Sequence, residues 1–258
     1  TIVFNGCIYN YPELRAELEA RGYAFFSSGD TEVILKAYHA FGPACVERFH
    51  GMFAFAILER DTGRVFMARD RFGIKPLYLA ETPGRLRFAS SLQAILAAGD
   101  VDTAIDPVGL HFYMSFHAVV PAPRTILAGV RKFPPATWRL FEPDGSVREE
   151  TYWRLDFTRT PDDLETAPDV WRDRVMAALK TAVDRRMVAD VPVGVLLSGG
   201  VDSSVIVALL AEAGQKDLKT FSIGFEAAHG EKGDEFAYSD LIAERFGTDH
   251  HELVLEPN

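Results

Sequence analysis

The chain has 258 residues, of which 48% are hydrophobic and 25% charged, and its formal net charge is −10. This composition is typical of a folded, soluble protein, and the length favours two domains. No apolar run approaches the roughly 20 residues that a membrane span requires, and acidic charge without a lysine–arginine stripe argues against a nucleic-acid partner.

The two cysteines, Cys7 and Cys45, have neither disulfide-framework nor metal-site spacing, which favours a cytoplasmic location. The sequence opens on TIVFNG, without an initiator methionine, in a stretch that is typical of a strand. It closes on LVLEPN, directly after another such stretch. We therefore expect a fragment truncated at both ends.

The first half predicts helices followed by hairpins. A helix is expected over YPELRAELEARG, with Pro12 near its start, and another over DTEVILKAYHAFG, with Asp30 as its N-cap. Two pairs of strands then turn at residues 61–63 and 83–84. This half therefore predicts antiparallel sheet covered by helices.

Proline and glycine are frequent from residue 99 to 168, and we place the boundary there, with domains over residues 1–155 and 156–258. Next comes an expected helix, with an apolar face made of Trp171, Val175, Leu179, Ala182 and Val183. The segments VGVLL, VIVALLAEAG, KTFSIGF, FAYSDLIAERFG and HHELVL then alternate between strand and helix patterns. That alternation predicts a parallel sheet.

The segment LLSGGVDSSVIVALL joins the first of these strands to its helix. We expect a fully buried strand over residues 193–197, a turn over 198–204 and a helix from Val205. Glycines let backbone amides approach a ligand, and the serines and the helix start add donors, so the pattern predicts phosphate binding. The loop lacks the Walker A lysine, which argues against γ-phosphoryl transfer. The alternative is an ordinary glycine-rich turn that binds nothing.

The loop SGGVDSS resembles the pyrophosphate-binding loop of N-type ATP pyrophosphatases, and VPVGVLLSGGVDSS is similar to the form found in glutamine-hydrolysing asparagine synthetases. The segments NGCIYNYPELR, SSGDTEVILKAY, FHGMFAFAILE, ARDRFGIKPLY and FASS resemble the class II glutamine amidotransferase domain of the same family. The resemblance implies a mixed α/β and α+β protein of two domains. An Ntn-type α/β/β/α sandwich is followed by part of a Rossmann-like parallel α/β ATP pyrophosphatase domain.

The resemblance also implies an ATP-dependent amidotransferase. One domain hydrolyses L-glutamine to ammonia, and the other adenylates a carboxylate acceptor with release of pyrophosphate and then amidates it. ATP and Mg²⁺ are the implied cofactors, and a homodimer is allowed.

Site residues follow from the same resemblance. Asn5, Gly6 and Asp30 match the glutamine-binding positions, although an acid at a helix start is more often a plain cap. Leu197 and Ile223 match positions that hold adenine, with a place in the core as the alternative for Ile223. The pyrophosphate positions are Ser198, Gly199, Gly200, Asp202, Ser203 and Ser204, and Asp202 is also the expected magnesium ligand.

Other polar groups receive no chemistry. The charged residues Arg69, Asp70, Arg71 and Lys75 form either a solvated turn or, by the resemblance, a structural junction near the interdomain contact. The pairs Asp234 with Glu235 and His250 with His251 could hold a metal, but we expect a helix start and a strand start instead.

The family's nucleophile is an N-terminal cysteine whose own amine activates the thiol. Cys7 cannot replace it, because its nitrogen is an amide within a strand, and Thr1 matches an interior position. We therefore expect no catalytic residue of the glutaminase in this chain, which should not hydrolyse glutamine. Cys7 and Ser91 also stand where the family usually has glutamates, in NGEIYN and FASE.

Three alternatives stay open. The segments GEKGDEF and LHFYMSFHAVVPAPRT are closer to a subgroup that amidates a dipeptide, such as N-acetylglutaminylglutamine, than to enzymes that act on free aspartate. Another ligase with the same loop, such as a tRNA-modifying or GMP-forming enzyme, is the second. The third is a non-catalytic nucleotide-binding homologue.

Overall fold

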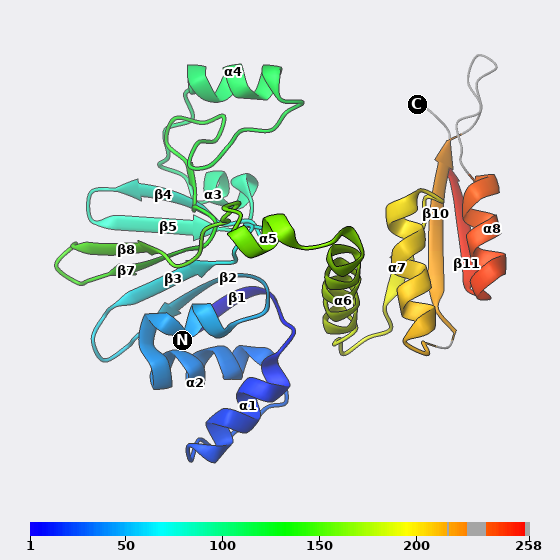
Figure 1. Ribbon diagram of the computed structural model, residues 1–258. Coiled ribbons are helices and arrows are strands. Elements are labelled where there is room, and N and C mark those ends of the chain that lie inside the picture. Colours follow the sequence, from blue (N-terminus) through cyan, green and yellow to red (C-terminus); the bar gives the residue numbers. More distant parts are fainter. Residues whose placement is uncertain (216, 226–235, 256–258) are drawn as a thin grey trace. The chain divides into compact units, whose positions relative to one another are not determined.

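The computed structural model describes residues 1–215, 217–225 and 236–255 (Figure 1). The chain divides into two compact units, Thr1–Phe157 and Thr158–Asn258. The division falls within the stretch that is rich in proline and glycine. Within the described residues, no helix is both long and apolar enough to cross a bilayer.

The first unit contains a five-stranded antiparallel sheet. Its order is β1 (Ile2–Ile8), β2 (Gly51–Leu58), β3 (Val65–Arg69), β7 (Thr137–Phe141) and β8 (Val147–Thr151). The expected turn at residues 61–63 joins β2 to β3, where Gly63 has a φ of +74°. The edge strand β1 carries Asn5 and Gly6, two of the three residues that are predicted to bind glutamine.

Helices cover one face of this sheet. They are α1 (Tyr11–Ala20) and α2 (Asp30–Phe41), and the 3₁₀ turn η1 (Gly42–Arg48) follows them. Side chains alternate along each strand, so Phe53, Phe55 and Phe66 pack beneath the helices on Leu18 and Ile34. All five are buried to 1% exposure or less, and burying each contributes about 2 kcal/mol.

A second sheet packs on the other face. Its order is β5 (Arg85–Ala89), β4 (Tyr78–Thr82) and β6 (Arg131–Lys132), and β4 turns into β5 at the expected residues 83–84. Ala54 and Met67 of the first sheet meet Leu79 and Phe133 between the layers. The helix α3 (Leu92–Ala97) packs Ile95 on β4, and α4 (Pro107–Ser115) follows. The predicted α/β/β/α sandwich is confirmed.

The second unit begins with the helices α5 (Pro161–Glu165) and α6 (Pro168–Arg186). The alternating part follows as β9 (Gly194–Leu196), α7 (Val201–Glu212), β10 (Lys219–Phe225), α8 (Phe236–Phe246) and β11 (Asp249–Leu255). The three strands pair in parallel in the order β11-β10-β9, as predicted. Val207 and Leu210 of α7 pack with Ala243 of α8 on one face of this sheet.

Two local expectations, on β9 and on the start of α7, were wrong. The strand β9 is short and largely exposed rather than fully buried, because it forms an edge of the described sheet and Leu196 lies on the uncovered face with 72% exposure. The helix α7 begins at Val201 and not at Val205, because Gly200 takes the extended N-cap conformation. The predicted apolar face of α6 exists but is exposed at Trp171 and Val175.

Candidate functional site

Gly6 lies at a point where β1 and β2 approach too closely for any side chain. A Cβ at this position would lie 2.2 Å from the carbonyl oxygen of Met52 and 2.8 Å from the Cα of Phe53. Real Cβ atoms do not tolerate such contacts, so another residue would push the two strands apart. The close approach of the two strands therefore explains why the asparagine–glycine motif has glycine at position 6.

The pairing of β1 also decides where the Gly6 amide points. Gly6 pairs with Phe53, but Phe53 spends its amide on the Asp70 carboxylate and its carbonyl on the Asp70 amide. The pair is thus a non-hydrogen-bonded one, and the Gly6 N–H points towards the open edge of the sheet. Within the described residues, no acceptor is recorded for this amide.

Asn5 lines a cavity of about 280 Å³ that opens between the two sheets. Its wall includes Ala54 of the first sheet, Phe88 of the second and Leu77. Asn5 itself is exposed, and within the described residues its carboxamide makes no hydrogen bond. The Asn5 carboxamide is therefore unpaired within the described residues, in a cavity whose lining is mostly apolar.

Asp30, at the start of α2, contacts the same end of β1. Its carboxylate accepts the N–H of Ile8 at 3.0 Å, two residues beyond Gly6 on the same open edge. The expectation that Asp30 is the N-cap was wrong: Gly29 is the N-cap and Asp30 is the first residue of α2. The Asp30 carboxylate binds the edge of β1 instead of the first amides of α2. It can therefore contact a cation as well as the Ile8 amide.

Glu32 fixes the loop that precedes α2, a role that the sequence reasoning missed. Its carboxylate accepts the amides of Phe26 and Ser27 and the Ser27 hydroxyl, and Lys36 lies 3.2 Å away. Burial by itself would raise the pKa of Glu32, but these hydrogen bonds, that of Ser27 foremost, lower the pKa to about 2. A glutamate at the third helical position was the available signal.

The charged run at residues 69–75 is a structural junction and not a solvated turn. Asp70, 1% exposed, accepts the amides of Phe53, Phe72, Ile74 and Lys75. Arg69 donates to the carbonyls of Lys75, Phe133 and Gly73, and burial lowers its pKa. The side chains of Arg69, Asp70 and Arg71 are thus used within the fold, which leaves these three groups unavailable for chemistry.

The second candidate site is the loop between β9 and α7. Ser198 donates its amide to the Ser203 hydroxyl at 3.3 Å, and Gly200 donates its amide to the Ser198 hydroxyl at 3.3 Å. The hydroxyls of Ser203 and Ser204 donate to the Gly200 carbonyl. The first backbone bond of α7 runs from Ser204 to Gly200, so the preceding amides of the helix have no internal acceptor.

Gly199 gives this loop its path. Its φ is +77°, and a Cβ there would lie 2.5 Å from the Cβ of Tyr238 and 2.7 Å from the amide nitrogen of Ser239. The start of α8 therefore leans directly on the loop. Val201 and Asp202 at the start of α7 are exposed, and their amides have no acceptor within the described residues, which suits an anion at the positive end of the helix.

The other residues that are predicted to bind the nucleotide lie in different environments. Asp202 is exposed in the first turn of α7, and Ile223 is 54% exposed on the uncovered face of β10. The core alternative for Ile223 is therefore wrong, because α7 and α8 cover only the face that carries Thr220 and Ser222. Leu197, in contrast, is 1% exposed and belongs to the core.

His250 and His251 lie at the start of β11 and point to opposite faces, as the alternation of a strand requires. His251 stacks on Phe221, whereas His250 contacts Thr220 and Ser222. His250 could also share a cation with Asp240 and Glu252, whose ligand atoms lie within 4.8 Å of one another. Asp234, Glu235 and the segment GEKGDEF lie at least partly outside the described residues.

A larger cavity, of about 730 Å³, lies at the start of β1 and contains none of the predicted site residues. Two charged side chains of its lining, Glu59 and Arg64, already have partners. Glu59 accepts the Tyr38 hydroxyl at 2.7 Å, and Arg64 donates to Glu142 at 2.8 Å. Size alone therefore does not make this cavity a site.

Two further sequence signals have structural explanations. Ser91, in place of the expected glutamate, is the N-cap of α3 and accepts the amide of Ala94 at 3.3 Å. Cys45 is fully buried in the helix-covered core, and burial raises the pKa of its thiol. Cys7 lies within β1, where its nitrogen is a peptide amide.

Residues 1–153 match the family described as glutamine amidotransferase domain, and residues 174–258 match the family described as asparagine synthase. Asparagine synthetase (glutamine-hydrolyzing) 1 of Bacillus subtilis is 42% identical over 225 residues, covering 87% of this chain and 34% of that protein. Asparagine synthetase (glutamine-hydrolyzing) 3 of the same organism is 34% identical, covering 99% and 42%. Asparagine synthetase B of Escherichia coli is 31% identical, covering 98% and 39%.

The chain thus spans less than half the length of these relatives. Among solved structures, it is similar to a glutamine phosphoribosylpyrophosphate amidotransferase of Bacillus subtilis complexed with ADP and GMP. The sequence identity is 16% and the TM-score 0.43, over 98% of this chain and 70% of that chain.

Proposed function

The chain belongs to the glutamine amidotransferase domain family and continues into an asparagine synthase segment, and from this premise we propose that it is part of a glutamine-dependent, ATP-consuming ligase. Its first unit binds glutamine for hydrolysis to glutamate and ammonia. Its second unit contributes to a site where an acceptor carboxylate attacks the α-phosphorus of ATP and expels pyrophosphate. Ammonia then displaces AMP to form the amide. The names of the relatives support aspartate as the acceptor.

The observation that carries this proposal is the open loop after β9. The amides at the start of α7, which have no acceptor within the described residues, form with the loop a cradle that attracts phosphate oxygens. An acid beside such a cradle would repel the phosphates by itself. Asp202 therefore fits a site for Mg²⁺, which would neutralise charge between the carboxylate and the leaving pyrophosphate.

The groups at the β1 edge support the glutamine half of the proposal. The Asp30 carboxylate is suited to the α-ammonium group of glutamine. The free carboxamide of Asn5 and the outward N–H of Gly6 are donors for the carboxamide oxygen of glutamine, on which negative charge develops during hydrolysis. Ile223 supplies an exposed apolar surface for adenine on β10.

The test is calorimetric titration of the chain with Mg²⁺-pyrophosphate. Wild type should bind, and Asp202→Asn should weaken binding about tenfold because the cation loses its ionised partner. Glu212→Gln, which removes an acid from the other end of α7, is the matched control and should bind like wild type. Equal affinity of Asp202→Asn and wild type would contradict the assignment of the cation site.

A further inference from the structure

The β9–β10 pairing ends one residue before the phosphate loop. The last paired residues are Leu196 and Phe221, after which the Leu197 amide donates to the Phe221 carbonyl at 2.8 Å. The Leu197 carbonyl does not stay bare: the Ser222 hydroxyl donates to it. A side chain thus replaces the ladder at the point where the backbone leaves the sheet.

Further polar groups continue from Ser222 into the layer between β10 and α8. Ser222 lies 3.3 Å from Nε2 of His250, His250 Nδ1 lies 2.8 Å from the Thr220 hydroxyl, and that hydroxyl lies 2.7 Å from the Thr248 hydroxyl. Thr220 and Ser222 are buried, at 0% and 4% exposure, and the His250 side chain is 12% exposed. Little water reaches these groups, so each bond is costly to lose.

The carbonyl at the end of this chain of hydrogen bonds fixes the direction of the protons. A carbonyl can only accept, so Ser222 donates to Leu197 and accepts from His250 Nε2–H. When the ring carries a proton on Nε2 alone, Nδ1 accepts the proton of the Thr220 hydroxyl, and Thr220 accepts from Thr248. Asp240 lies 3.8 Å from Nε2, which also favours a proton on that nitrogen.

Fixing the Leu197 carbonyl also fixes the first amide of the loop. The C=O of Leu197 and the N–H of Ser198 belong to one planar peptide group and point in opposite directions. When Ser222 holds the carbonyl, the Ser198 N–H is aimed into the loop, where it meets the Ser203 hydroxyl. A rotation of this peptide plane would turn the Ser198 N–H away from the Ser203 hydroxyl and so disturb the conformation of the loop.

We propose that His250 is a positioning residue for the phosphate loop, acting through Ser222 on the peptide plane between Leu197 and Ser198. This role rests on the proposed function, because it concerns the same pyrophosphate site. His250 does not touch the ligand. It positions the Ser222 hydroxyl, which binds the Leu197 carbonyl. The direction of the Ser198 N–H is thereby fixed.

The test uses two amide substitutions that copy different ring nitrogens. In His250→Gln the amide nitrogen reaches the position of Nε2 and can donate to Ser222, whereas in His250→Asn the shorter side chain reaches only the position of Nδ1. For Mg²⁺-pyrophosphate we expect His250→Gln to stay within about twofold of wild-type affinity and His250→Asn to lose about fivefold. His251→Asn, on the opposite face, should bind like wild type.

Two further measurements separate positioning from simple packing. Ser222→Ala should weaken binding about as much as His250→Asn, and the double variant should lose no more than either, because both break one link. Long-range ¹H–¹⁵N correlation should find the His250 proton on Nε2. A proton on Nδ1 would overturn the proposal, and so would equal affinities of the Gln and Asn variants.

The outcomes also distinguish this role from the function on which it rests. A wild-type chain that does not bind Mg²⁺-pyrophosphate would remove the proposed function and this role with it. A wild-type chain that binds, with unchanged affinity in His250→Asn and Ser222→Ala, would remove the role of His250 alone. Circular dichroism of each variant shows that the comparison is between folded proteins.

Discussion

At the scale of single residues, Asp70 and Glu32 are two carboxylates that bind backbone amides. Asp70 accepts four amides and Glu32 accepts two amides and a hydroxyl, and each holds a loop beside the candidate glutamine site. Such groups replace secondary structure where the chain turns. Asp30 differs from them, because it meets the strand edge through the single amide of Ile8.

Glu32→Gln should change how stability depends on pH. The folded-state pKa of Glu32, about 2, lies below the ordinary value of 4.5, so the ionised group stabilises the fold above pH 4.5. This stabilisation is lost as the pH falls from 4.5 towards 2. Urea unfolding should find the variant less stable than wild type at pH 7, with the difference shrinking near pH 2.

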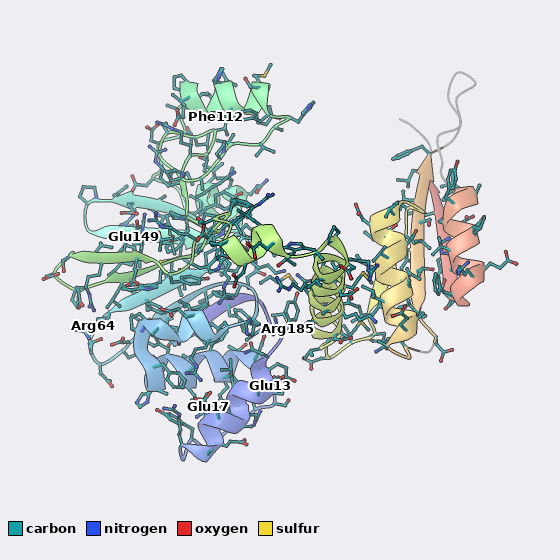
Figure 2. The ribbon with its side chains drawn as sticks, viewed as in Figure 1. Glu13, Glu17, Arg64, Phe112, Glu149 and Arg185 are labelled. Carbon is teal, nitrogen blue, oxygen red and sulfur yellow. The ribbon has the colours of Figure 1, made fainter. Side chains whose placement is uncertain are left out.

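Glu13→Gln is the control for this prediction. Glu13 occupies the third position of α1, as Glu32 does in α2, but it is exposed (Figure 2). The exposed glutamate should change unfolding little at either pH. A wild-type minus Glu32→Gln difference that is the same at pH 2 and pH 7 would contradict the assigned role of the hydrogen bonds.

Asp30→Asn should weaken glutamine binding while keeping the fold. The amide oxygen of asparagine can still accept the Ile8 N–H, but the charge that attracts an ammonium group is lost. We expect about a tenfold rise in the glutamine dissociation constant by calorimetry. Asp61→Asn, in the exposed turn between β2 and β3, should leave the constant unchanged. Equal constants for Asp30→Asn and wild type would leave Asp30 as a purely structural group.

At the scale of elements, the sequence predicted those parts whose signals are local. The turn at residues 61–63 and the alternation of strands and helices after β9 are examples, since turn residues and hydrophobic periods lie within a few positions. β6, β7 and β8 were not predicted. β6 pairs with β4 and β7 pairs with β3, which lie far away in sequence. β8 pairs with its neighbour β7, but all its residues are exposed and show no alternating burial.

The same contrast explains what was missed in the candidate sites. The glycines of the loop SGGVDSS are visible in the sequence, but the Tyr238 backbone that makes Gly199 obligatory comes from α8. Likewise, nothing near Ser222 predicts its bond to Leu197 or its contact with His250. Contacts between distant segments depend on the register of the sheet, and a single sequence does not specify that register.

The strand β10 allows the adenine and pyrophosphate parts of the nucleotide to be tested separately. Ile223→Asn places a polar group on the exposed apolar face of this strand. It should weaken ATP binding about fivefold and leave Mg²⁺-pyrophosphate binding unchanged, because only ATP carries a base to pack there. Leu253→Asn, equally exposed on β11 and farther from β9, is the control. A parallel loss for both ligands would contradict an adenine role.

At the scale of the whole molecule, the chain is two independently packed units. The residues from 154 to 160 that join them are exposed, and Arg154 and Arg159 offer trypsin sites on either side of the division after Phe157. Limited trypsin digestion should therefore cut first after one of these arginines, giving two protected fragments by mass spectrometry. First cleavage after Lys36 within α2 or after Arg245 within α8 would show that the units do not pack as described.

The conformation of the loop after β9 depends on contacts with residues that follow it in the chain. Gly199 takes its path against the start of α8, and the Leu197 carbonyl is held from β10 and, through Ser222, from β11. A nascent chain that has emerged only as far as α7 has the glycines but not the scaffold that shapes them. The loop therefore reaches the conformation described above only after β10, α8 and β11 have followed it out of the ribosome.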